Sequence, residues 1–349
     1  MLKSIFISLS ILLLTGCNNI SSTNKKTSKL SLIQSRGSLI CGVSGKIPGF
    51  SFLNSDGTYS GLDVDMCKAF ATTILGTQNN ISYRQVTAAE RFLALRTGEI
   101  DILSRNTTVN LSRDAKGGNS VEFGPVVFYD GQGIMVKKES NIKSLNNLNG
   151  KSICVGSGTT SEQNINDVFE RRNIEYTPIK YQDLDKVLAG YKQNRCIAMT
   201  SDLSQLASAK SSFKNPDLHI ILPDVLSKEP LAPATVGNDQ SLSDAIEWTI
   251  FALIEAEELG INIKNVDDKY KQAQNNINQK KIRRFFGIDS NLGFKLGLKN
   301  DFTYQVIKNV GNYADIYNRN LGPDTKINIK RGLNKLYKDG GILISPPFN

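Results

Sequence analysis

Residues 37–43 read GSLICGV and residues 63–75 read DVDMCKAFATTIL, and this pair of segments decides the fold. The first segment is short and apolar, as expected of a buried strand, and the second repeats apolar residues at helical spacing. Asp63 could cap the helix, and Asp65 complements the dipole of its first turn. The body of the chain therefore begins with a strand that is followed by a helix.

The same alternation continues and then starts again further along the chain. The first module adds a strand, a helix and a strand at 82–86, 88–97 and 100–103. The second module alternates strands and helices at 152–155, 161–173, 176–181, 184–193 and 196–200. This order predicts an α/β fold with a parallel sheet in each of two lobes. Ligands of such sheets bind beyond the carboxyl ends of the strands, near helix N-termini.

Two segments would connect the lobes, at 129–133 and at about 222–233, and the glycines of the first permit hinge angles. The resulting division is a first lobe of residues 31–130 plus 228–349 and a second lobe of residues 134–224. The later part of the chain is helical, with helices predicted at 243–259, 304–318 and 330–338 and a polar, helix-rich insertion at 264–301.

The N-terminus reads as a secretion signal. Its apolar run at residues 5–14 is too short to span a bilayer. The run ends in Leu14-Thr15-Gly16-Cys17, which resembles the bacterial lipobox. We expect a lipoprotein signal peptide at 1–16, acylation of Cys17 for anchoring to a membrane, and a flexible tether at 17–30. The alternative is an ordinary signal peptide with a cysteine at this place by chance.

The formal charge of +9 raises the question of an anionic partner. Export argues against nucleic acid, and a cationic face toward anionic lipid headgroups is the simpler account. No second apolar run has spanning length, so we expect a soluble, monomeric body in the periplasm or an equivalent extracytoplasmic space.

Four cysteines remain besides Cys17, and export places them in an oxidising compartment where paired cysteines are expected. Three pairings are possible. We favour Cys41–Cys67 and Cys154–Cys196, because each pair lies within one expected lobe. Metal binding is the alternative, but no CxxC spacing occurs and His219 is the only histidine, so we expect no metal and no cofactor.

The sequence offers little for catalysis. It has no GxSxG motif, and His219 lies in an apolar strand context that favours a structural role. The stretch Gly156-Ser157-Gly158-Thr159-Thr160 lacks the lysine of a phosphate-binding loop. It is either an ordinary strand-to-helix loop or a turn whose N–H groups bind a carboxylate.

Two charged residues complete a possible site for a zwitterion. Arg113 follows a polar turn after the strand at 100–103, where it is either a surface residue or a bidentate ligand for a carboxylate. Asp202 ends an apolar strand, where it could hold an ammonium group or cap the next helix.

Many short motifs of the chain resemble one protein family. They include Gly61-Leu62-Asp63-Val64-Asp65, Glu90-Arg91-Phe92, Leu103-Ser104-Arg105-Asn106-Thr107-Thr108, Tyr129-Asp130-Gly131-Gln132-Gly133, Ser227-Lys228-Glu229-Pro230 and Val310-Gly311-Asn312-Tyr313. Together they resemble the family-3 extracellular solute-binding proteins, and within that family the general L-amino-acid-binding subfamily of ABC importers. The resemblance covers about residues 36–348.

The resemblance implies a type II periplasmic-binding fold that closes on its ligand, and it implies a role for each matching residue. Arg113 would bind the ligand α-carboxylate, with Asn106 and Thr108 in the polar turn and Thr159 and Thr160 at a helix start as hydrogen-bonding partners. Asp202 would pair with the α-ammonium, while Ser44 and Ile47 would line the side-chain pocket. Ser44 and the run Met199-Thr200-Ser201 depart from the family pattern, which leaves side-chain selectivity open.

The expected function is therefore a lipid-anchored binding protein that delivers free L-amino acids to ABC permease subunits of the inner membrane. It would not be an enzyme. Two alternatives remain at this point: a periplasmic dehydratase-like enzyme with the same fold, and a sensor that signals through another protein.

Overall fold

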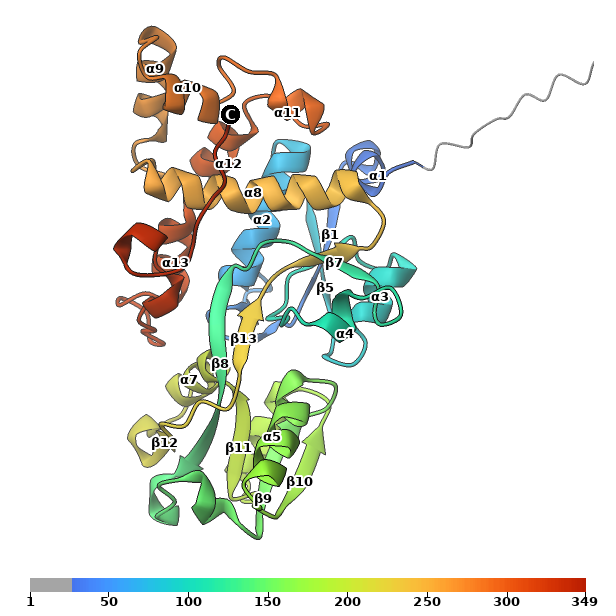
Figure 1. Ribbon diagram of the computed structural model, residues 1–349, viewed down its shortest axis with the longest axis vertical. Helices are drawn as coiled ribbons and strands as arrows, with labels where there is room; N and C mark the ends of the chain where they lie inside the picture. Colours follow the sequence, from blue (N-terminus) through green and yellow to red (C-terminus); the bar gives the residue numbers. More distant parts are fainter. Residues whose placement is uncertain (1–26) are drawn as a thin grey trace, which may run out of the picture.

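The computed structural model describes residues 27–349, which form two α/β halves that lie end to end in Figure 1. The predicted signal peptide, Cys17 and residues 17–26 of the predicted tether lie outside the described residues. No helix within residues 27–349 is long and apolar enough to cross a membrane.

The sheet of the first half has the strand order β5-β1-β6-β14-β7. β1 runs parallel to β5 and to β6, whereas β14, which follows the return of the chain from the other half, is antiparallel to its neighbours. The strands are β1 (Leu39–Val43), β5 (Ile81–Gln85), β6 (Ile102–Leu103), β7 (Val121–Phe123) and β14 (Ala234–Val236). A small antiparallel sheet beside it contains β2 (Lys46–Ile47), β3 (Ser51–Leu53) and β4 (Tyr59–Ser60).

The sheet of the second half has the order β10-β9-β11-β8-β12, and β13 pairs with the N-terminal part of β8. β9 is parallel to β10 and β11, and β8 is antiparallel to β11 and β12. The strands are β8 (Phe128–Lys137), β9 (Lys151–Gly156), β10 (Tyr176–Tyr181), β11 (Ala198–Asp202), β12 (His219–Ile221) and β13 (Lys228–Leu231). The predicted βαβαβ modules and the α/β fold class are therefore confirmed.

Helices flank both sheets. Those of the first half before the crossing are α1 (Lys29–Arg36), α2 (Leu62–Leu75), α3 (Arg91–Thr97) and α4 (Leu111–Asp114). The second half carries α5 (Thr160–Arg171), α6 (Leu184–Lys192) and α7 (Leu203–Ser211). After the return come α8 (Gln240–Glu258), α9 (Val266–Asn275), α10 (Lys280–Phe285), α11 (Leu292–Lys295), α12 (Phe302–Val310) and α13 (Tyr313–Leu321).

The main core lies between α2, α8 and the helices that follow α8. Leu62, Phe70, Ile250, Leu253 and Ile307 belong to this one buried apolar cluster. The predicted helix-rich insertion at 264–301 forms α9, α10 and α11, and Phe285 and Phe286 anchor it to the same cluster. This late part of the chain therefore belongs to the first half, as Figure 1 shows.

The structure corrects several local predictions. The helix expected at 304–318 is two helices, because Gly311 has φ 89° and Asn312 starts a new capping box with Asp315. The helix expected at 330–338 is wrong: the structure has only the 3₁₀ turns Gly332–Asn334 and Tyr337–Asp339 there, and Gly332 has φ 50°.

Two corrections concern the beginning of the body. The tether was expected to extend to residue 30, but α1 begins at Lys29 and buries Leu30. Asp63 does not cap α2, because the N-cap is Gly61. Only glycine fits that position, since its φ is 124° and a Cβ there would lie 2.2 Å from the carbonyl oxygen of Phe50.

The two halves are joined by a pair of strands. β8 runs as one continuous strand out of the first half and into the second, and β13 lies antiparallel beside it with Glu229 opposite Asp130. Neither glycine of this crossing has a left-handed φ in this structure. Gly131 and Gly133 lie inside β8, where a Cβ would approach side-chain atoms of Val225 and Leu203 to 2.6 and 2.4 Å. Their smallness serves close packing instead.

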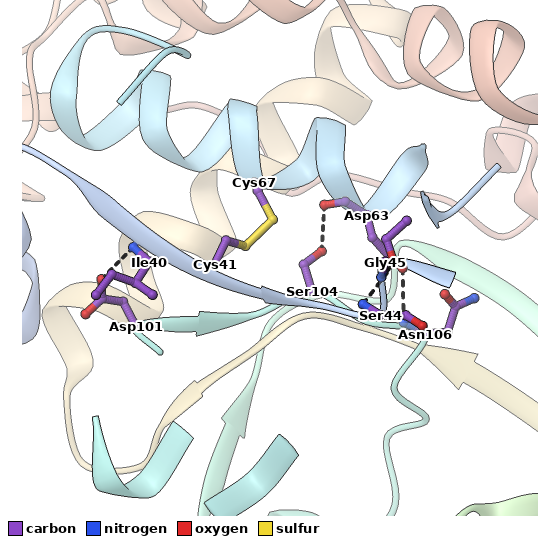
Figure 2. Close-up of a disulfide and its surroundings, with 10 residues drawn as sticks. Ile40, Cys41, Ser44, Gly45, Asp63, Cys67, Asp101, Ser104 and Asn106 are labelled. Carbon is purple, nitrogen blue, oxygen red and sulfur yellow. Dashed lines mark hydrogen bonds between the residues drawn. A yellow bond between two sulfur atoms is a disulfide. The ribbon is translucent and has the colours of Figure 1, made fainter. Parts of the chain in front are cut away.

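The structure contains the two disulfides that the sequence favours. Cys41 of β1 is bonded to Cys67 of α2, and Cys154 of β9 is bonded to Cys196, just before β11. Figure 2 shows the first disulfide, which links α2 to β1. Each disulfide therefore ties a strand to a neighbouring element of the same half.

Candidate ligand-binding cleft

A polar cleft lies between the two halves, at the carboxyl ends of the parallel strands. The residues that line it come from both sides: Ile47, Ala88, Arg91, Arg105, Asn106, Thr108 and Arg113 from the first half, and Gly156, Thr159, Thr160, Ser161, Gln182, Asp183, Leu184, Val187, Thr200, Ser201, Asp202 and Gln205 from the second. Seven of the eight predicted ligand-binding residues are among them. Ser44 is not, although it is buried at the end of β1, where its N–H donates to Ser51 Oγ.

Arg113 is held in the cleft wall by its own turn. Its helix α4 is capped by Asn110, whose side-chain oxygen accepts from the Arg113 N–H at 3.0 Å. The guanidinium donates through Nη1 to the carbonyl of Thr108 at 2.7 Å and lies over the ring of Phe92. Burial lowers the pKa of Arg113 to about 10, so it stays charged at neutral pH. A fixed, buried guanidinium of this kind is suited to a carboxylate.

Two further arginines, Arg91 and Arg105, line the same wall. Arg105 donates through Nε to the carbonyl of Val86 at 2.7 Å. Arg91 is 3% exposed, and its buried Nε has no hydrogen-bond partner within residues 27–349. Burial, and then the charges of Arg113 and Arg105, lower the pKa of Arg91. The first half therefore presents more positive charge than a single α-carboxylate would neutralise.

The side chain of Asn106 is also unsatisfied. Its residue is 6% exposed, and neither atom of its amide has a partner among the described residues. Its backbone has φ 34°, a left-handed conformation that asparagine tolerates, and its N–H donates to Asp63 Oδ2 at 3.2 Å. Figure 2 shows this contact, which runs from the turn after β6 to the start of α2. A buried amide without partners at a cleft wall is suited to a polar ligand, because leaving it unpaired is costly.

The second half supplies the opposite charge through Asp202, the last residue of β11. Asp202 could instead have capped α7, but its side chain makes no capping hydrogen bond to the backbone of that helix. Its carboxylate accepts from Gln205 Nε2 at 2.6 Å. Asp130 of β8 takes that place instead, since its Oδ2 accepts from the N–H of Ser204 in the first turn of α7. Asp202 is thereby left to face the cleft. Burial, and then the neighbouring carboxylates of Asp130 and Glu229, raise its pKa well above the usual range.

Thr159 and Thr160 stand at the start of α5, as predicted. The Thr159 hydroxyl caps the helix by accepting from the N–H of Glu162 and donates to the carbonyl of Gly156 at 2.7 Å. The Thr160 hydroxyl donates to Glu229 Oε2 at 2.8 Å. Since both hydroxyl hydrogens are engaged, donation to a carboxylate falls to the backbone N–H groups of the first helical turn.

Sequence reasoning did not assign roles to Arg91, Arg105, Asp183 or Glu229, although three of them lie in motifs that carry the family resemblance. Spacing gave no sign that Glu229, more than a hundred residues beyond Thr108, would bond to it. His219 lies outside the cleft lining, where its Nδ1 lies 2.9 Å from the hydroxyl of Tyr191. Among residues 27–349, no group of three or more His, Cys, Asp or Glu side chains is placed to hold a metal ion.

Two α/β halves joined by paired strands, with a cleft of opposite charges between them, define a two-lobed solute-binding protein. The chain belongs to the bacterial extracellular solute-binding proteins, family 3, whose family model matches residues 39–342.

The chain is similar to known binding proteins over nearly its whole length. It is 45% identical to the general L-amino acid-binding periplasmic protein AapJ of Rhizobium johnstonii, over 91% of this chain and 92% of AapJ. It is 38% identical to the glutamate/glutamine/aspartate/asparagine-binding protein BztA of Rhodobacter capsulatus, over 92% of this chain and 93% of BztA. An ABC transporter periplasmic binding protein from Brucella ovis, solved with glutathione bound, has a TM-score of 0.88 and 38% identity, covering 93% of this chain and 100% of that one.

Proposed function

We propose that this protein is the substrate-binding component of an ABC-type importer for free L-amino acids. The observation that supports this most directly is the presence of Arg113 and Asp202 in one cleft, on opposite halves of the molecule. An L-amino acid carries the matching pair of charges. The names of AapJ and BztA support the same ligand class.

Binding would proceed by closure of two lobes, residues 31–130 plus 228–349 and residues 134–224. The ligand α-carboxylate would meet Arg113 and Asn106 on the first lobe. Closure would then bring the start of α5 onto the carboxylate and Asp202 onto the α-ammonium. Closure removes these charges from water, which is favourable only when each charge is matched. A molecule without the ammonium or without the carboxylate would leave one buried charge unpaired.

The arrangement also favours a ligand with a second carboxylate. Three guanidinium groups, those of Arg91, Arg105 and Arg113, line the cleft on the first half, and they can bind more than one carboxylate. Glutamate and aspartate would supply the missing negative charge, and the names of BztA and the glutathione-bound structure are consistent with acidic ligands.

We further propose that the protein acts outside the cytoplasm as a monomer, is anchored to a membrane through Cys17, and delivers its ligand to permease subunits. Replacement of Cys17 by serine should release the protein from the membrane fraction.

The proposal for the ligand is tested by incubating the purified protein with labelled L-amino acids. Recovery of bound, unchanged ligand supports a carrier, whereas turnover would support the dehydratase-like alternative, and the absence of binding to every amino acid would refute the proposal.

A further inference from the structure

Glu229 bonds to both sides of the cleft with one carboxylate. It lies on β13, beside the crossing strand β8, and is 1% exposed. Its Oε2 accepts from the hydroxyls of Thr108, of the first half, at 2.6 Å and Thr160, of the second half, at 2.8 Å. Its Oε1 accepts from Asn164 Nδ2 at 2.8 Å and from Ser227 Oγ at 2.5 Å. The carboxylate thus has four donors and is not itself a cleft-lining group.

These contacts fix the direction of two hydroxyl groups that do line the cleft. A threonine hydroxyl has a single hydrogen and two lone pairs. Because Thr108 and Thr160 each give that hydrogen to Glu229, both hydroxyl oxygens can only accept from a group inside the cleft. The two oxygens lie 3.4 Å apart, so they present a pair of acceptors.

A pair of acceptors in the cleft that Asp202 also lines suits a cation and disfavours an anion. An ammonium group has three donors and no acceptor, so Asp202 and the two hydroxyl oxygens of the same cleft match its donors in number. A carboxylate facing the two hydroxyl oxygens would meet only lone pairs on them, and it would depend on Arg113 and the N–H groups at the start of α5. With a neutral amide in place of Glu229, one amide group would donate, so at least one hydroxyl would be free to turn its hydrogen into the cleft.

We propose that Glu229 is a positioning residue that holds Thr108 and Thr160 as acceptors for the ligand ammonium and so makes the cleft selective for amines. This inference rests on the proposed function, because it presumes that an L-amino acid is the ligand. Glu229 acts through the two hydroxyls and does not itself touch the ligand. The same bonds connect the halves when the cleft is closed, so the selection operates in the closed form.

The alternative is that Glu229 only stabilises the junction of the two halves. Loss of its charge would then lower the affinity for every ligand by the same factor, because all ligands need the closed form. A positioning role predicts an unequal loss. The affinity for a ligand with the amine would fall, and the affinity for an analogue of the same shape without the amine would change little.

The test compares L-glutamate with glutarate, which has the same carbon chain and both carboxylates but no ammonium group. Affinities are measured by calorimetry and competition for the wild type and for Glu229→Gln. We expect the affinity for L-glutamate to fall at least tenfold and that for glutarate to change less than threefold, since a hydrogen bond to a charged group has this order of effect. Equal losses for both compounds, or no loss for L-glutamate, would overturn the inference.

Two further variants secure the interpretation. Glu255→Gln alters another buried carboxylate, which pairs with Lys281 of α10 in the first half, and it should leave both affinities unchanged. Thr160→Val removes one of the two acceptors and should reduce the same preference for the amine if Glu229→Gln does not fold. Failure of the wild type to bind any labelled amino acid would refute the proposed function itself, which is a separate result.

Discussion

Lys46 of β2 lies across the cleft from Asp183 at the start of α6, with 3.0 Å between Lys46 Nζ and Asp183 Oδ2. Asp185 Oδ1 lies 3.5 Å from the same nitrogen. The three residues join the first half to the second at the rim of the cleft. This ion pair can exist only when the halves are together, so it favours the closed form.

We predict that Lys46→Met weakens ligand binding about two- to fivefold, because a partly exposed ion pair contributes about 0.2–1 kcal/mol. Titration calorimetry at low and high salt measures the loss, which should shrink as salt screens the wild-type pair. Arg84→Met is the matched control, since it breaks an exposed pair with Glu99 inside the first half. A similar loss in both variants would show that closure is not involved.

Arg113→Ala and Asp202→Ala should each lower amino-acid affinity at least about a hundredfold. Each change leaves the opposite charge of the bound ligand buried without its partner, a loss of roughly 3–5 kcal/mol. Calorimetry checks the result, with Arg96→Ala as a control because Arg96 is exposed and bonds to Asn119. Affinity like that of the wild type in both cleft variants would refute the site.

Arg91→Met should change ligand preference. The guanidinium of Arg91 is buried, and its Nε has no partner within residues 27–349. An acidic side chain of the ligand would therefore gain binding energy from Arg91, and an uncharged side chain would not. Competition binding should show a loss of affinity for L-glutamate that exceeds the loss for L-alanine by about tenfold. An equal effect on the two amino acids would mean that Arg91 has a structural role only.

Removal of the disulfides should lower stability without altering the cleft. Chain-entropy arguments give about 3.5 kcal/mol for Cys41–Cys67 and about 4 kcal/mol for Cys154–Cys196, whose partners are 26 and 42 residues apart. Urea unfolding of each double alanine variant measures these losses. Because each disulfide lies within one half, the folded fraction should keep wild-type affinity, and a large affinity change would contradict this expectation.

Asp63 should make stability depend on pH. Burial raises its pKa to about 7, far above the value of about 3.9 in an unfolded chain. Between these values the native state holds more protons than the unfolded state, so the free energy of unfolding falls as pH rises from about 4 to about 7. Burial of Asp130, which raises its pKa to about 6, adds to the same trend.

Asp63→Asn should flatten this decline, as measured by urea unfolding at a series of pH values. Asp56→Asn is the control, because the exposed Asp56 has its pKa lowered by hydrogen bonds from Thr58 and contributes with the opposite sign. An unchanged pH profile in Asp63→Asn would show that its carboxyl group is already ionised in the folded protein at low pH.

The sequence predicted the elements that depend on local pattern. The apolar strand at Leu39–Val43 and the helix at Leu62–Leu75 follow from periodicity, and the strand Tyr176–Tyr181 was predicted with its observed limits. The cleft residues Arg113 and Asp202 followed from the family resemblance, since spacing alone left each of them open to a structural reading.

What could not be predicted depends on contacts between distant segments. Asp130 caps α7 and so leaves Asp202 free for the cleft, but these residues approach only because β8 pairs with β11. Glu229 meets Thr108 and Thr160 only through the return strand β13. The helix predicted at 304–318 failed for a local reason, since its apolar spacing hides the break at Gly311.

The pairing of β8 with β13 has a mechanical consequence. Four facing residue pairs, from Lys228 opposite Gly131 to Leu231 opposite Phe128, make the junction a short two-stranded ribbon. Sliding along such a ribbon breaks its hydrogen bonds, and a slip of one residue turns every side chain to the wrong face. Bending and twisting keep the bonds. The two halves should therefore open by bending and twisting of this ribbon, without sliding along it. Each closure would then bring Thr108 and Thr160 back to the same alignment.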